Sequence, residues 1–133
     1  MFWAQGARPY VFSTALPPAA AAAALEAMRL VEEHPALVAT LGERIGDFQR
    51  ACARHGIAAA SPTAIQPVVV GDPARAVSVS ARLRELGQLV PAIRPPTVPE
   101  GGARLRISLS AAHSREQVLA LADALGRALG HGA

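Results

Sequence analysis

The stretch IQPVVVGDP, residues 65–73, decides the fold, because a strand-like run passes directly into the start of a helix. Residues 65–70 are rich in β-branched side chains and are followed by a glycine, a pattern typical of a short buried strand. Asp72 can cap the next helix, and Pro73 suits its first position. We therefore expect a buried strand at residues 65–70 and a helix that begins at residue 73.

The helix expected after residue 73 leads into further strands. Residues 89–93 are the next strand candidate, and the prolines and glycines of residues 95–102 exclude regular structure from much of the following loop. Residues 103–109 alternate between apolar and polar side chains. We expect Leu105, Ile107 and Leu109 to face helices, and Arg104, Arg106 and Ser108 to face away.

Two helices are expected on the amino-terminal side of this region. Residues 19–33 have high helix propensity and follow Pro17-Pro18, which suits the start of a helix. His34-Pro35 should break this helix before a second one, in which apolar residues recur at spacings of three and four over residues 37–52.

A final helix is expected at the carboxy-terminal side. Ser114 and Gln117 have the spacing of a capping box. The apolar stripe that follows consists of Val118, Leu121, Leu125 and Leu129. With the strands above, these helices predict a small α/β layer structure.

The composition narrows the class of protein. The chain has 133 residues, 51% of them hydrophobic, which suits one compact core. No stretch is long and apolar enough to span a bilayer, and residues 1–10 do not resemble a secretory signal, so we expect a cytoplasmic location. All thirteen basic residues are arginine and are scattered, and aromatic residues are few, so nucleic-acid binding is not expected.

The residues that often form catalytic or metal sites do not group here. Cys52 is the single cysteine, which excludes an internal disulfide and fits a packing role. Glu43 and Asp47 fit a solvated helix face better than a pair of catalytic acids. His113 has no cysteine, histidine or carboxylate at ligand spacing, so no metal site is expected.

Four stretches resemble the α-oxoamine synthase family, in the same order along the chain. They are residues 12–18 (FSTALPP), 65–72 (IQPVVVGD), 91–99 (PAIRPPTVP) and 104–113 (RLRISLSAAH). The resemblance covers nearly all of this chain but only about the final third of a family member. Within the family, the sequence of residues 92–99 most resembles that of the member that makes a precursor of biotin.

The resemblance implies a fold-type-I enzyme that uses pyridoxal 5'-phosphate (PLP) and is active as a homodimer. Residues 1–34 would be the end of the large domain and a connecting helix. Residues 35–133 would be the small carboxy-terminal domain, a short sheet with helices packed on it. The implied reaction is a decarboxylative condensation of L-alanine with a pimeloyl thioester. The pimeloyl group could be carried by coenzyme A or by a carrier protein.

The resemblance also assigns roles to four residues. Arg94 would bind the carboxylate of the amino-acid substrate, and Thr97 would contact the substrate from the same loop. A guanidinium can donate to both carboxylate oxygens at once, which suits this role. Without the family, Arg94 would fit a surface ion pair and Thr97 would be a residue tolerated between prolines. Ser13 and Thr14 would reach the cofactor phosphate, whereas ordinary helix capping is the alternative.

The absence of lysine limits what this chain can do alone. PLP is linked to such enzymes through a lysine amine, and this sequence has none. We assign no catalytic residue to this chain. Two hypotheses remain open: a portion of the enzyme that needs the lysine-bearing large domain or a homodimer partner, or a non-catalytic interaction or dimerisation module that retains the fold.

Overall fold

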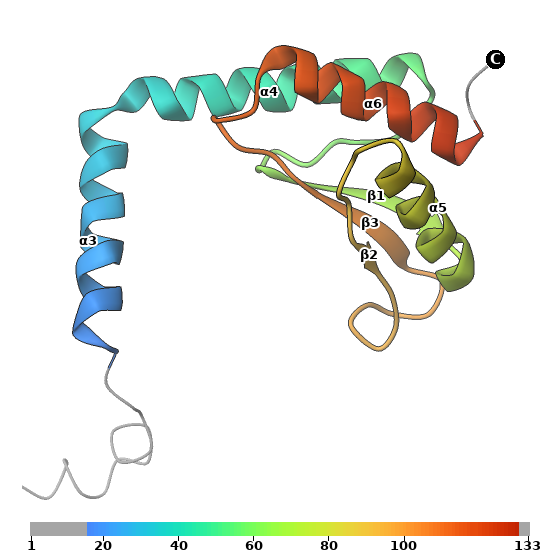
Figure 1. Ribbon diagram of the computed structural model, residues 1–133, viewed down its shortest axis with the longest axis horizontal. Coiled ribbons are helices and arrows are strands. Elements are labelled where there is room, and N and C mark those ends of the chain that lie inside the picture. The colour runs from blue at the N-terminus through green and yellow to red at the C-terminus, as the bar shows by residue number, and fades with distance from the viewer. Residues whose placement is uncertain (1–15, 131–133) are drawn as a thin grey trace, which may run out of the picture. The chain divides into compact units, whose positions relative to one another are not determined.

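The computed structural model describes residues 16–130 and divides the chain into two compact units, Met1–Pro35 and Ala36–Ala133 (Figure 1). The described part of the first unit is essentially the helix α3, Pro18–Glu33. Pro17 precedes it and the helix ends before His34, as the sequence predicts. None of its residues is buried, and Leu25, Met28 and Val31 are all about half exposed or more.

The described part of the second unit contains a three-stranded antiparallel sheet and three helices. The strands are β1 (Ile65–Gly71), β2 (Ala92–Ile93) and β3 (Ala103–Ser108), in the order β1-β3-β2. The helices are α4 (Pro35–Arg54), α5 (Pro73–Glu85) and α6 (Arg115–Leu129). The expected α/β structure, a short sheet with helices packed on it, is confirmed (Figure 1).

Local capping places the starts of α5 and α6 where the sequence predicts them. The Asp72 carboxylate accepts a hydrogen bond from the Arg75 backbone N–H at 2.6 Å. Ser114 and Gln117 form a complete capping box, in which each side chain accepts from the other's backbone N–H. Both helix starts are therefore stabilised by neighbours in sequence.

The core lies between one face of the sheet and the helices. Leu105 and Ile107 of β3 are buried, and Arg106 and Ser108 are exposed, so the alternation predicted for this strand is confirmed. Fifteen buried apolar residues form one cluster, with Phe48 and Cys52 from α4 and Leu125 from α6 among its fully buried members. Burial raises the pKa of the Cys52 thiol to about 12, in agreement with a packing role.

Two expectations about the strands are wrong in part. Residues 65–70 were expected to form a buried strand, yet Ile65 is 42% and Val69 62% exposed. β1 lies at an edge of the sheet and buries only the face that bears Gln66 and Val68. The strand expected at residues 89–93 is reduced to residues 92–93, since Pro91 has no N–H to donate and Leu89 lies in solvent.

The helices of residues 16–130 include none that is long and apolar enough to cross a membrane.

Candidate functional site

The loop that joins β2 to β3 carries both predicted substrate-binding residues. The last residue of β2, Ile93, pairs with Arg104 of β3. This pairing fixes the position of Arg94, the first residue after the strand. The Thr97 backbone N–H then donates to the Arg94 carbonyl oxygen at 3.1 Å, which closes a turn across the two prolines. Arg94 and Thr97 are therefore brought together, on one turn and with exposed side chains.

The rest of this loop is closed by its own backbone. The Gly102 N–H donates to the Pro99 carbonyl oxygen at 2.9 Å, and Arg104 Nε donates to the Gly102 carbonyl oxygen at 2.8 Å. A Cβ at Gly102 would lie 2.9 Å from that same Pro99 oxygen, so only glycine fits there without a shift. The loop is thus held at its carboxy-terminal end as well as at Arg94.

The Arg94 guanidinium has no ion-pair partner within residues 16–130, where no carboxylate oxygen lies within 4.0 Å of it. Arg29, Arg44, Arg50, Arg82 and Arg115 pair with carboxylates, whereas in this part of the chain Arg94 shares its lack of such a partner with Arg54, Arg75, Arg84, Arg104, Arg106 and Arg127. No carboxylate in the described structure therefore occupies the guanidinium N–H groups of Arg94 that a substrate carboxylate would use.

The two predicted phosphate-binding residues, Ser13 and Thr14, lie outside the described residues. Within residues 16–130, no cluster of histidine, cysteine, aspartate and glutamate could hold a metal ion. The chain also has no lysine amine, so its own residues cannot form the covalent link to PLP.

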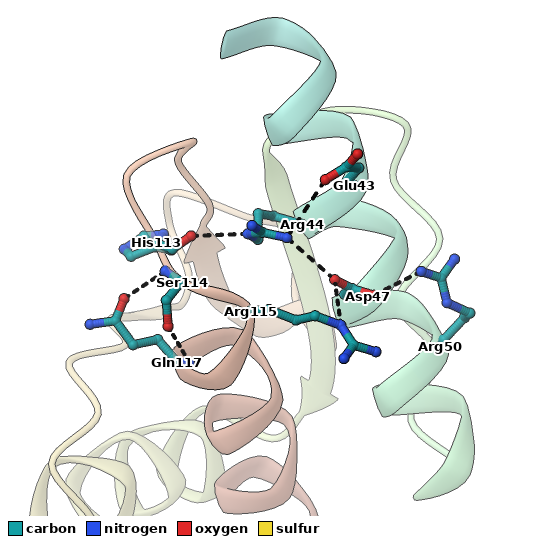
Figure 2. Close-up of polar contacts among 8 residues, drawn as sticks. All are labelled: Glu43, Arg44, Asp47, Arg50, His113, Ser114, Arg115 and Gln117. Carbon is teal, nitrogen blue, oxygen red and sulfur yellow. Dashed lines mark hydrogen bonds and ion pairs between the residues drawn. The ribbon is translucent and has the colours of Figure 1, made fainter. Parts of the chain in front are cut away.

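A second polar cluster surrounds Asp47 (Figure 2). Arg50 donates to one oxygen of the Asp47 carboxylate at 2.8 Å, while Arg44 and Arg115 lie 3.5 and 3.3 Å from the other. The expectation that Asp47 lies on a solvated helix face is wrong, because it is 7% exposed. Arg44 and Arg50 flank it at a spacing of three, a signal visible in the sequence, whereas Arg115 comes from α6 and could not be found in that way.

The Asp47 cluster is suited to holding the structure together. The hydrogen bond from Arg50, together with the charge and hydrogen bond of Arg115, keeps the pKa of the Asp47 carboxyl below its ordinary value of 3.8, although burial opposes this. A carboxylate that stays ionised at neutral pH and is shared by three arginines is a poor general acid or base. The cluster joins α4 to the start of α6.

Comparison with known proteins shows which family this chain is similar to. A family model described as aminotransferase class I and II matches residues 3–125. Among similar proteins, the 8-amino-7-oxononanoate synthase of Methylobacillus flagellatus is 55% identical over 124 residues, or 92% of this chain and 31% of the relative. That of Xanthomonas campestris is 51% identical over 94% of this chain and 31% of the relative.

Solved structures show the same fold. Serine palmitoyltransferase from Sphingomonas wittichii matches 97% of this chain and 34% of its own, with a TM-score of 0.79 and 33% identity. The 8-amino-7-oxononanoate synthase from Francisella tularensis matches 95% of this chain and 37% of its own, with a TM-score of 0.73 and 26% identity. This chain therefore spans about a third of the length of the proteins it resembles.

Proposed function

Since this chain belongs to the aminotransferase class I and II family, we propose that it is the carboxy-terminal portion of a PLP-dependent 8-amino-7-oxononanoate synthase. The complete enzyme would condense L-alanine with a pimeloyl thioester, with loss of carbon dioxide. The observation that carries this proposal is the identity of about half over more than nine-tenths of the chain to relatives that bear this name. The reaction would belong to biotin biosynthesis, in the cytoplasm.

The contribution of this chain would be to hold the amino-acid substrate. The Arg94 guanidinium would bind the L-alanine carboxylate through two parallel hydrogen bonds. The turn that Thr97 closes on Arg94 supports this role, and no carboxylate in the described structure competes for the guanidinium. Thr97 would supply a hydroxyl from the same turn, and the prolines of the loop would reduce the entropy lost when the substrate orders it.

The cofactor would be held mainly by the part of the enzyme that lies beyond this chain. PLP supplies an electron sink for the carbon that reacts. Ser13 and Thr14 would be the contribution of this chain, as donors to the cofactor phosphate. The covalent link requires a lysine from the large domain, because this chain has none.

Two features support the proposal that the complete enzyme contains a large domain in addition to this chain. The chain spans 31% of the length of its relatives, and the helix α3 buries none of its residues within the described structure. In the proposed enzyme, residues 1–34 belong to the large domain and residues 35–133 form the small domain. The same large domain would supply most of a homodimer interface.

An alternative is that the chain is a non-catalytic module that keeps the fold for interaction or dimerisation. The exposed apolar side chains of α3 would suit such a role. The two functions differ in whether an assembled site that contains this chain can turn over substrate.

The proposal can be tested with a chimeric enzyme. This chain would replace the matching third of the Methylobacillus flagellatus synthase, so that the lysine comes from the relative. We expect the chimera to bind PLP with the absorbance of the parent and to form 8-amino-7-oxononanoate. A chimera that folds and attaches PLP but makes no product would favour the interaction module.

A control addresses the chain alone. Borohydride reduction in the presence of PLP should leave no stable pyridoxyl adduct on any internal side chain. An internal adduct would contradict the assignment of the cofactor link to a missing domain.

A further inference from the structure

A pocket of about 380 Å³ lies where the residues before β2 meet the end of β3 and the first turns of α6. Its volume falls in the range of roughly 300 to 1,000 Å³ that is usual for sites of small molecules. The loop of residues 94–102 joins the other ends of β2 and β3, so the pocket and Arg94 lie at opposite ends of this strand pair.

The lining of the pocket is partly polar and partly apolar. Its accessible apolar surface comes from Leu89, Ala120 and Leu121, because the other apolar lining residues, Val90, Ile107, Leu109 and Val118, are each buried to more than nine-tenths in the core. Leu89 stands at the rim and is 80% exposed, so a molecule in the pocket would cover apolar surface that is now in water. Because Gln88, Ser108, His113 and Gln117 bring polar groups to the same lining, the pocket favours a ligand that has both a polar group and a short hydrocarbon part.

His113 contributes a hydrogen-bond donor to the wall. The Ser110 backbone N–H donates to His113 Nδ1 at 3.0 Å, so this ring nitrogen is an acceptor. The neutral ring then carries its hydrogen on Nε2, which can donate to a ligand. The loop is also held from the side of α4, because Arg44 Nε donates to the His113 carbonyl oxygen at 3.0 Å.

Gln117 contributes a second donor in the same way. Its side-chain oxygen accepts the Ser114 backbone N–H at 2.9 Å as part of the capping box. This contact fixes the orientation of the side-chain amide and leaves its NH₂ group to donate. Figure 2 shows His113 and Gln117 on the side of Ser114 that faces away from Asp47.

We propose that this pocket binds a short aliphatic carboxylic acid. The carboxylate would accept hydrogen bonds from His113 Nε2 and Gln117 Nε2, and the hydrocarbon chain would lie against Leu89, Ala120 and Leu121. No aspartate or glutamate lines the pocket, so nothing on its wall repels an anion. An alkyl ammonium ion could be accepted only by neutral groups such as Gln88 and Ser108, would face the donors of His113 and Gln117, and would find no carboxylate partner in the lining.

The direct test is a titration of the full chain followed by ¹H–¹⁵N correlation spectra. Hexanoate should produce saturable shifts in the amides of residues 87–90, 107–109 and 117–121. A Kd on the order of 1 mM is expected for so small a ligand. Hexan-1-ol should bind more weakly, and hexylamine should cause no saturable shift.

The variant Gln117→Glu tests the contribution of the Gln117 side-chain NH₂ group. Glutamate keeps an oxygen that can accept the Ser114 N–H, but it replaces the donor NH₂ group with a charged oxygen. The affinity for hexanoate should fall by about tenfold or more. Ala81→Glu adds the same charge at an exposed position of α5 and should leave the affinity unchanged.

The variant Ala120→Trp gives a second test that leaves the capping box intact. Ala120 is exposed and lines the pocket, so an indole there should fill it and abolish the hexanoate shifts. Three results would overturn the proposal: equal binding of hexanoate and hexylamine, shifts that spread over the chain without saturation, or unchanged affinity in both Gln117→Glu and Ala120→Trp.

Discussion

Arg44 donates from Nε to the carbonyl oxygen of His113 at 3.0 Å, and so ties the middle of α4 to the loop that precedes α6. The same guanidinium lies 3.5 Å from Asp47, which also pairs with Arg115 in the first turn of α6. Two segments far apart in the sequence are thus joined by a network of charge-assisted hydrogen bonds and ion pairs. This network predicts a specific dependence of stability on pH.

Asp47→Asn should lower the midpoint of thermal unfolding at pH 7, because three arginines lose their shared anion. The pKa of Asp47 is lowered in the folded state, so its contribution is complete above the ordinary value of 3.8 and is lost as the pH falls through the lowered folded value. The difference between wild type and variant should therefore shrink in acid. Thermal unfolding from pH 2 to 7 measures this.

The exposed pair of Arg82 and Glu85 provides the control for that experiment. Both side chains are more than 60% exposed, so Glu85→Gln should change stability much less than Asp47→Asn does. Equal effects of the two substitutions would show that the Asp47 network contributes no more than a surface ion pair.

Ile107→Asp should destabilise the chain by roughly 3 kcal/mol or more, because it places an unpaired charge at a position that is 2% exposed. Ile107→Val removes one methylene and should cost only about 0.5 to 1.5 kcal/mol. Unfolding in denaturant distinguishes the two. Near wild-type stability of Ile107→Asp would mean that the other face of β3 is the buried one.

Gly126→Ala should destabilise the chain by about 1 to 3 kcal/mol through overpacking. A Cβ at this position would lie 2.7 Å from His55 Nδ1 and 2.8 Å from His55 Cγ. The penalty should disappear when His55→Ala is combined with it, a coupling that a double-mutant cycle measures. Gly42→Ala is the matched control in α4, where nothing lies within 4 Å of the new Cβ, and it should stabilise by about 0.5 to 1 kcal/mol.

Cys52 should resist thiol reagents in the folded chain. A pKa of about 12, against an ordinary value of 9.0, lowers the thiolate fraction at neutral pH about a thousandfold, and the side chain is fully buried. Labelling followed by mass spectrometry should show rapid modification only after unfolding. Fast labelling under native conditions would place Cys52 outside the core.

The features predicted from sequence are those that depend on neighbours along the chain. Asp72 and Ser114 cap helices through bonds to residues three positions away, and the alternation in β3 reflects strand geometry alone. The grouping of Arg94 and Thr97 was accessible for the same reason, since four residues form the turn.

The features missed depend on tertiary arrangement. The exposure of Val69 follows from its place on the sheet face opposite Gln66 and Val68, which the core does not cover and which a β-branched run does not encode. The burial of Asp47 depends on Arg115, which reaches it only after α6 packs beside α4. The pocket beside His113 likewise forms from three segments that meet only in the folded chain.

The measurement that tests the central proposal most directly is the dependence of turnover on L-alanine in the chimeric synthase, compared between wild type and Arg94→Lys. Lysine keeps the charge but loses the bidentate fork, so kcat/KM for L-alanine should fall about tenfold to a hundredfold. The thioester dependence should change less, and the absorbance of bound PLP should persist. An unchanged dependence on L-alanine would contradict the assignment of Arg94 to the substrate carboxylate, and loss of the cofactor absorbance would assign it to cofactor binding instead.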